Sequence, residues 1–348
     1  MSETSKAPDL EQRFLEPKGW RWDHFKNDGR TIRFGTMSPQ DNIPDAVVVC
    51  LPGLSEFAEK YFEVAQSLVD RNMSVWVLDW MGQGRSDRYL DDNPHKRHSH
   101  GFDQDIDDLH KFILNHIKPS SVHADKEQIP LAMLAHSMGG HIGLRYLARY
   151  PDIFECAALS TPMIGLKDLR SIPPSLAKIV TAAFNFLSGE DYVHGGGDWR
   201  QDMRPSPGHD AFSSDPVRGA VHNAWCLADP KLQVGRITYG WLHEAVKSCA
   251  QLQKTSTLEN IHTRCLITLA GHEDFIDNPA IRRAAKIMPQ AELLEFPKAA
   301  HETLMECDDI RDVFLEDFQK LIKEKIIAPP SGLETFLRKG QNANLIIH

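Results

Sequence analysis

A serine at a sharp turn is the first feature of this sequence that could do chemistry. Leu131 to Ala135 is a continuous apolar run typical of a buried strand, and helical spacing begins after Ser137 and lasts until Pro151. Ser137 is therefore expected at a strand-to-helix corner, near helix N–H groups that favour a developing negative charge. Ala135 and Gly139, on either side, are small enough for strand and helix to pass closely. This pattern predicts a nucleophile, with an incidental serine at a buried junction as the alternative.

A serine needs a base to take its proton and a third group to orient that base. Residues 270–277 follow one late apolar run and contain Asp274, and residues 298–303 follow the last run and contain His301. If both runs are parallel strands, their loops lie at the same sheet edge as Ser137. We therefore expect His301 to be the general base and Asp274 to hold its tautomer. The carboxylates that compete with Asp274 are Asp277, Glu273 and Asp79.

Acyl transfer also needs two backbone N–H groups aimed at the oxyanion of the tetrahedral intermediate. One is expected from Met138, the residue after the nucleophile. The other is expected from Leu54, in the loop after the apolar run 46–51. The alternative interpretation is that Pro52-Gly53 forms only a turn.

Apolar runs alternate with amphipathic segments through most of the chain. Residues 20–26 and 31–34 predict a hairpin around the turn Asn27-Asp28-Gly29. The further strands are expected at 46–51, 74–78, 131–135, 155–159, 264–270 and 291–296, and the helices at 58–71, 102–117, 137–150, 279–288 and 310–327. This alternation predicts an α/β fold with a mostly parallel sheet and helices on both faces.

The alternation breaks between residues 161 and 248, which contain helical pieces but no apolar strand run. We expect this segment to be a helical cap, or lid, inserted after the sixth strand, walling Ser137 from water and shaping an acyl pocket. Residues 176–187 are apolar over most of their surface, which indicates either the core of the cap or an acyl tunnel or membrane-contacting face. The candidate pocket walls are Trp199, Phe212, Trp225 and Trp241. Residues 1–16 and 330–348 are expected to be peripheral tails.

Composition and charge argue against a nucleic-acid partner and indicate the cellular compartment. The 348 residues carry a net charge of −9 and contain no long Lys/Arg block, which argues against nucleic acid. Six scattered cysteines indicate a reducing compartment. The sequence shows neither a secretory signal nor an apolar run of about 18 residues, so we expect a cytoplasmic protein, with peripheral membrane contact left open. The histidines at 95, 98 and 100 suggest a solvated loop rather than a metal site.

Four motifs carry a resemblance to a known family. Pro52–Tyr61 is similar to a His-Gly-x-x-Glu-(x)3-Arg/Lys-Tyr loop, with Pro52 in place of the usual His, and residues 79–86 resemble an Asp-x-x-Gly-x-Gly-x-Ser turn. Residues 271–274 and 300–302 match acid and base motifs, in the order Ser, Asp, His. Over roughly residues 20–325 the sequence resembles the α/β-hydrolase superfamily, in particular the serine hydrolases that include bacterial lysophospholipases and monoacylglycerol lipases. Residues 214–216 and 238–242 look like cap segments of the lysophospholipase branch.

The resemblance implies a single α/β-hydrolase domain over residues 1–348, without a metal or an organic cofactor. It implies hydrolysis of a monoacyl lipid ester, a lysophospholipid or a monoacylglycerol, through an acyl-enzyme on Ser137. The alternative is a general carboxylesterase, thioesterase or peptidase of small acyl substrates. A non-catalytic ligand-binding protein is a third hypothesis, against which the set Ser137, Asp274 and His301 argues.

Overall fold

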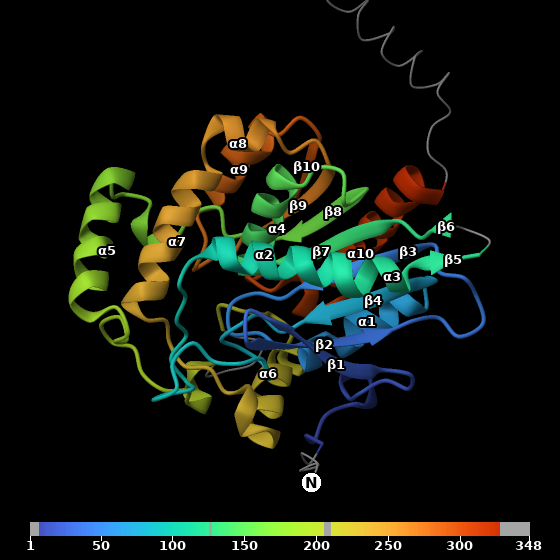
Figure 1. The fold of residues 1–348 in the computed structure, drawn as a ribbon, viewed down its shortest axis with the longest axis horizontal. Helices are drawn as coiled ribbons and strands as arrows, with labels where there is room; N and C mark the ends of the chain where they lie inside the picture. Colours follow the sequence, from blue (N-terminus) through green and yellow to red (C-terminus); the bar gives the residue numbers. More distant parts are fainter. Residues whose placement is uncertain (1–6, 125–126, 205–209, 328–348) are drawn as a thin grey trace, which may run out of the picture.

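An eight-stranded sheet runs through the centre of the computed structural model, which describes residues 7–124, 127–204 and 210–327 (Figure 1). The strand order is β1-β2-β4-β3-β7-β8-β9-β10. β1 pairs antiparallel with β2 and β2 with β4, while the remaining neighbours are parallel. The strands are β1 (Arg21–Asn27), β2 (Arg30–Met37), β3 (Ala46–Leu51), β4 (Met73–Leu78), β7 (Leu131–His136), β8 (Cys156–Ser160), β9 (Arg264–Ala270) and β10 (Ala291–Phe296). The predicted α/β fold is confirmed.

Continuous apolar runs form the central strands because both faces of the sheet are covered. Every residue of β3, β4, β7 and β8 is buried. Successive side chains point to opposite faces, so Val47 and Val49 enter one core cluster while Ala46 and Val48 enter the other. Two hydrophobic cores, one on each side of the sheet, follow from this period of two.

Helices fill both of these cores. One face is covered by α2 (Phe102–Phe112), α4 (Ser137–Arg149), α7 (Tyr239–Leu252), α8 (Thr255–Glu259) and α9 (Asn278–Ile287). The other face is covered by α1 (Phe62–Val69), α6 (Pro216–Ala228) and α10 (Asp308–Ile322). The smaller elements are the strand pair β5 (Val122–His123) and β6 (Glu127–Gln128), α3 (Lys118–Ser120), the π-helical turns Ile113–Ile117 and Lys323–Ile327, and 3-10 turns at Gln12–Phe14, Ala58–Tyr61, Lys167–Leu169, Gln201–Met203, Pro230–Leu232 and Thr303–Met305.

The parallel strands end at one common edge. Their register pairs Leu51 with Ala135 and His136 with Ser160. The loops after β3, β7, β9 and β10 therefore emerge side by side. Ligand sites of open parallel sheets occur at this carboxyl edge.

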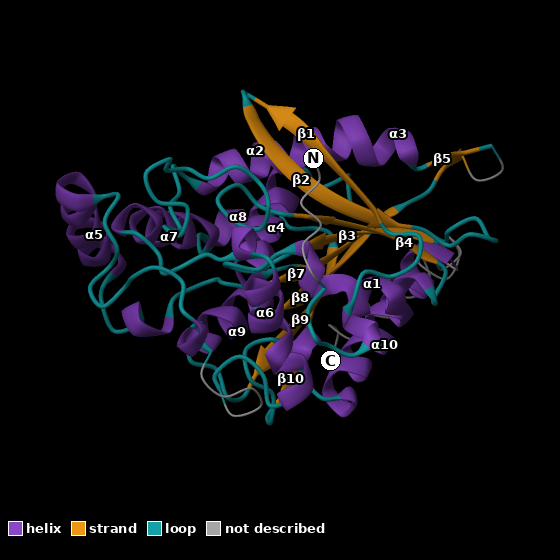
Figure 2. Cartoon of the chain, turned by 90° about the horizontal axis from the view of Figure 1, so that it is seen from below, coloured by secondary structure: helices purple, strands orange, loops and turns teal. Residues whose placement is uncertain are grey.

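Residues 161–248, here called the insert, form no strand of the central sheet within their described part. α6 and α7 of the insert pack against the two cores, whereas α5 (Pro174–Ser188) lies at the outer edge of the molecule beside α7 (Figures 1 and 2). Only Ala177 and Thr181 of α5 are buried. The interpretation of residues 176–187, which lie in α5, as the packed core of a cap is therefore wrong, because most of their apolar side chains are exposed.

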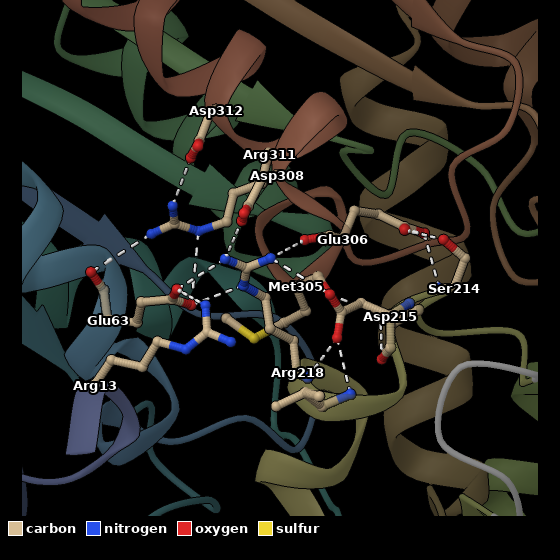
Figure 3. Close-up of polar contacts among 12 residues, drawn as sticks. Arg13, Glu63, Ser214, Asp215, Arg218, Met305, Glu306, Asp308, Arg311 and Asp312 are labelled. Atoms are coloured by element: carbon tan, nitrogen blue, oxygen red, sulfur yellow. Dashed lines mark hydrogen bonds and ion pairs between the residues drawn. The ribbon is translucent and has the colours of Figure 1, made fainter. Parts of the chain in front are cut away.

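A buried arginine on α6 fastens the insert to the core helices (Figure 3). The Arg218 guanidinium donates hydrogen bonds to both oxygens of Glu63 on α1, at 2.8 and 2.9 Å. It also donates to Asp308 on α10 at 2.6 Å and to the carbonyl of Glu306 at 2.8 Å. One side chain of the insert thus joins two helices that are far apart in the sequence.

Part of the N-terminal segment expected to be a peripheral tail is packed against the rest of the protein. Phe14 is only 2% exposed, and its carbonyl accepts a hydrogen bond from the indole of Trp225 on α6. Residues 1–6 and 330–348 lie outside the described residues. Within the described ranges, every helix falls short of the length and apolar character that crossing a bilayer requires.

Candidate active site

Ser137 lies at the corner between β7 and α4, as its sequence context predicts. Its φ of 49° is in the left-handed region, which a non-glycine residue enters only when its surroundings enforce it. Gly139 is required next to it, because a Cβ there would lie 2.2 Å from the carbonyl oxygen of Leu51. The packing of α4 against the end of β3 thus holds the serine in this conformation.

The imidazole of His301 contacts the serine hydroxyl from the loop after β10. His301 Nε2 lies 3.0 Å from Ser137 Oγ, and its Nδ1 lies 2.7 Å from Oε2 of Glu273. The Glu273 carboxylate also accepts hydrogen bonds from the backbone amides of Phe275 and Ile276. Burial would raise the pKa of Glu273, but the interaction with His301 and the two amides outweigh burial and leave this pKa below its ordinary value. A carboxylate so held stays ionised and fixes the tautomer of His301.

The predicted partner of His301, Asp274, does not contact it, so this expectation is corrected to Glu273. Asp274 points outward with a side chain 65% exposed, and pairs with Lys167 at 2.7 Å. Lys167 also donates to the carbonyl of Glu273, which holds the loop in the turn that directs Glu273 inward. The two carboxylates are adjacent in sequence, and the direction of one loop decides between them.

The other two competing carboxylates have different partners. Asp277 precedes α9 and lies 3.5 Å from Arg283. Asp79 is fully buried and accepts hydrogen bonds from Arg33 and from the amides of Ala58 and Arg85. Asp79 therefore shapes the turn after β4 and does not approach His301.

The loop after β3 lies against Ser137 in a shape that suits an oxyanion hole. Gly53 donates its N–H to Glu56 Oε2, and Ser55 donates its N–H to the amide oxygen of Gln83 at 3.1 Å. Between these two, the N–H of Leu54 has no acceptor among the described residues, and Leu54 lines the same cavity as Ser137. Met138 is in the first turn of α4, where backbone N–H groups lack intrahelical acceptors. Both expected donors stay predictions, and the geometry is compatible with them.

The amino-acid sequence matches the family described as serine aminopeptidase, S33, over residues 42–308. The chain belongs to this family. It is 31% identical over 299 residues to lysophospholipase L2 of Escherichia coli, with 83% of each chain covered. It is also 34% identical over 212 residues to monoacylglycerol lipase of Mycolicibacterium smegmatis, which covers 61% of this chain and 65% of the relative. The protein is thus a serine hydrolase of the S33 family.

Solved structures show the same fold. A thermostable carboxyl esterase from Bacillus coagulans superposes with a TM-score of 0.69 at 18% identity, covering 89% of this chain and 100% of the esterase. Monoglyceride lipase from Saccharomyces cerevisiae superposes with a TM-score of 0.65 at 17% identity, covering 88% and 96% of the two chains. Both comparisons support the α/β-hydrolase fold expected from the sequence motifs.

In this S33-family hydrolase the Ser137 hydroxyl opens into a cavity of about 540 Å³. The insert provides most of its wall, together with the loops that carry Leu54, Phe275 and His301. The apolar lining residues of the insert are Met163, Leu166, Leu169, Val193, Trp199, Met203, Phe212, Val234, Ile237, Trp241 and Leu242. Of the aromatic walls expected from sequence, Trp225 is absent from this lining and packs on Phe62 in the core.

A group of buried charges lies directly behind the serine. Glu56, His136 and Glu302 bring one ligand atom each within 4.8 Å of one another, an arrangement that could hold a metal ion. Lys60 already occupies the cationic position, because its ammonium lies 2.6 Å from both carboxylates. Arg204 adds a second cation with a bidentate contact to Glu302. Glu56 and Lys60 belong to the motif at residues 52–61, but the motif did not predict that they form a buried charge cluster with Arg204 and Glu302.

The loop with three histidines is solvated only in part: His100 is exposed and His95 is half-buried, but the residues between 97 and 99 are buried, contrary to expectation. Arg97 is fully buried, and His98 is 5% exposed with its Nδ1 2.8 Å from the Thr238 hydroxyl. The backbone of Arg97 also pairs with Ile237. This loop is therefore a structural support for the insert.

Proposed function

We propose that Ser137, His301 and Glu273 form the catalytic triad of an ester hydrolase that cleaves single-chain acyl lipids. The observation that carries this proposal is the continuous hydrogen-bonded path from Ser137 Oγ through His301 to Glu273, which opens into an apolar cavity. The named relatives, a lysophospholipase and a monoacylglycerol lipase, support a lysophospholipid or monoacylglycerol as substrate.

In the proposed reaction, Ser137 Oγ attacks the ester carbonyl while His301 Nε2 takes its proton. The N–H groups of Leu54 and Met138 stabilise the oxyanion of the tetrahedral intermediate. His301 then protonates the leaving alcohol, and the acyl group stays on Ser137. A water molecule, deprotonated by His301, attacks this acyl-enzyme and releases the fatty acid.

The cavity supports an extended acyl chain. Its volume of about 540 Å³ lies within the roughly 300–1,000 Å³ typical of small-molecule sites. The insert provides most of its wall, and most of the side chains that it contributes are apolar, so we propose that the insert acts as the cap expected from the sequence.

We also propose that α5 contacts a membrane or micelle surface. Ile179, Phe186 and Leu187 are 67%, 90% and 76% exposed, and Leu176, Val180 and Phe184 are also exposed. Apolar side chains of this number on one outer helix favour an interface with lipid. Such contact would bring the insert close to the source of a lipid substrate.

Hydrolysis of a substrate panel tests the proposed function. The panel contains lysophospholipids, monoacylglycerols, p-nitrophenyl esters of four and twelve carbons, an acyl thioester and an aminoacyl p-nitroanilide. We expect the highest kcat/KM on long single-chain esters, and loss of activity in Ser137→Ala. A preference for the four-carbon ester, the thioester or the anilide would overturn the lipid assignment. Full activity of Ser137→Ala would overturn the mechanism.

A further inference from the structure

Four charged side chains form a compact buried cluster behind the proposed triad. Glu56, Lys60, Arg204 and Glu302 are between 2% and 7% exposed. Lys60 bridges the two glutamates, and Arg204 donates to both oxygens of Glu302 at 2.7 and 3.0 Å. Two carboxylates and two cations make the cluster neutral. This neutrality matters, because an unpaired charge is costly at a buried position.

One end of this cluster holds the loop that carries Leu54. Glu56 Oε2 accepts hydrogen bonds from the Gly53 amide at 2.5 Å and from the Tyr61 hydroxyl at 2.8 Å. Gly53 is tightly enclosed, since a Cβ on it would lie 2.8 Å from the His136 ring and 3.3 Å from Ser137 Cβ. The position of Glu56 thus sets the position of the Leu54 N–H relative to Ser137.

The other end of the cluster holds the loop that carries His301. Glu302 is the next residue, and its N–H donates to the carbonyl of Phe212 in the insert at 2.7 Å. The Phe212 ring lies under the Arg204 guanidinium at 3.8 Å and stacks on Phe275, which meets the His301 ring edge-to-face. Any displacement of Glu302 therefore moves the backbone of His301.

Arg204 differs from the other three members because it belongs to the insert. Its backbone carbonyl accepts a hydrogen bond from the side-chain amide of Asn223 on α6, which also donates to the carbonyl of Gln201. The loops after β3 and β10 supply three charges, with a net charge of −1, and the insert supplies the fourth.

We propose that Arg204 is a positioning residue, through which the insert completes a neutral buried cluster and so aligns the oxyanion loop with His301. The inference rests on the proposed function, because it assumes that Ser137 and His301 react. It extends that function by giving the insert a role in the chemical step besides walling the pocket.

Loss of Arg204 would leave one uncompensated negative charge close to two imidazoles. The His136 ring lies within 4.8 Å of both the carboxylates and the His301 ring. The other titratable groups that face this region include Glu273 after β9, Tyr61 after β3 and His222 on α6. Two further carboxylates lie nearby: Asp210, whose charge acts on Arg204, and Glu306, which accepts the N–H of Ala300. None of them supplies a positive charge, because burial lowers the pKa of His222 well below its usual value and lowers that of His136 to about 4. The unbalanced charge would therefore favour protonated imidazole.

Steady-state hydrolysis of p-nitrophenyl butyrate between pH 5 and 9 tests the proposal on the full chain. For Arg204→Met we expect kcat to fall by about 10²-fold, as for a displaced catalytic group, with a smaller change in KM. We expect the acidic limb of the kcat/KM profile to shift to higher pH by about one unit. One additional negative charge within about 10 Å of an imidazole predicts a shift of this size. Arg204→Lys keeps the charge and should keep the wild-type limb.

The double variant Arg204→Met/Glu302→Gln makes the test specific for charge. It restores neutrality without restoring any ion pair, so its acidic limb should return to the wild-type position. Arg200→Met is the matched control, since Arg200 is 75% exposed and pairs only with exposed Asp202 among the described residues. An unchanged limb and kcat in folded Arg204→Met would overturn the proposal, as would a shift that the double variant fails to reverse. Ser137→Ala and fluorophosphonate labelling of the wild type separately test whether the triad itself reacts.

Discussion

Glu273 Oε2 lies 2.7 Å from Nδ1 of His301, while the carboxylate of Asp274, one residue later, lies 2.7 Å from Lys167 at the surface. A buried carboxylate held by two backbone amides is a better orienting group than an exposed one, because it is rigid and shielded from water. The carboxylate that contacts His301 in this chain is thus Glu273, and its neighbour Asp274, which the sequence motif had indicated, does not contact it.

Replacement of these two carboxylates should give opposite outcomes. For Glu273→Gln we expect kcat to fall by about 10⁴-fold, as when the triad acid of a serine protease becomes an amide. For Asp274→Asn we expect a change within about threefold, as is usual for a surface substitution. Hydrolysis of p-nitrophenyl butyrate measures both, with thermal unfolding as the check on folding. A large loss in Asp274→Asn with little loss in Glu273→Gln would contradict the assignment.

The N–H of Leu54 should be needed for catalysis and its side chain should not. Leu54→Pro removes the N–H, and we expect kcat to fall by about 10²- to 10³-fold, the usual effect of losing one oxyanion donor. Leu54→Ala keeps the N–H and serves as the matched control, with kcat close to wild type. Equal kcat values for the two variants would exclude Leu54 as a donor.

The outer face of α5 should govern binding to lipid surfaces. Phe186→Ser and Leu187→Ser should each weaken partitioning into phosphatidylcholine vesicles by about tenfold, because each removes an apolar side chain that would be buried in lipid. Sedimentation with vesicles measures this, and hydrolysis of a water-soluble ester should be unchanged. Val122→Ser is the control, since Val122 is 64% exposed on β5, at the opposite side from α5 (Figure 1). Equal partitioning of all three variants and the wild type would argue against the contact.

Arg218 should contribute strongly to the stability of the fold. It is 2% exposed and donates to both oxygens of Glu63, so Arg218→Met leaves this buried carboxylate with the longer contacts to Arg13 at 3.1 Å and Arg311 at 3.7 Å (Figure 3). We expect the free energy of unfolding in urea to fall by about 3–5 kcal/mol. The control is Arg149→Met, which breaks a half-exposed pair with Asp107 and should cost less than about 1 kcal/mol. Comparable losses in the two variants would refute the stabilising role of the Arg218–Glu63 pair.

Acidification should destabilise the protein through its paired buried glutamates. Burial would raise the pKa of Glu302, but Arg204 and Lys60 outweigh burial and hold it well below the ordinary value of about 4.3. A lowered folded-state pKa stabilises the protein above that ordinary value, and the contribution is lost as pH falls toward the folded-state pKa. Urea unfolding at pH 7, 5, 4 and 3 measures the loss, which should be smaller in Glu302→Gln. An identical pH dependence in that variant would contradict this expectation.

The order of strands and helices followed from the sequence, because periods of 2 and 3.6 residues are local properties of the chain. The corner at Ser137 and the loop position of His301 followed for the same reason, since apolar runs before each residue mark the strand ends. The side chains expected at positions 137 and 301 lie in hydrogen-bond contact.

Only the tertiary structure decided which carboxylate orients His301. Glu273 and Asp274 share one loop, and their directions depend on hydrogen bonds to Lys167, Phe275 and Ile276 that no local period encodes. The neutral cluster of Glu56, Lys60, Arg204 and Glu302 depends on loops up to 246 residues apart meeting at one sheet edge, and so does not follow from spacing. The exposure of the apolar side chains of α5 was also decided by the tertiary structure. An apolar sequence favours burial, but only the packing of the rest of the chain determines whether the protein itself covers it.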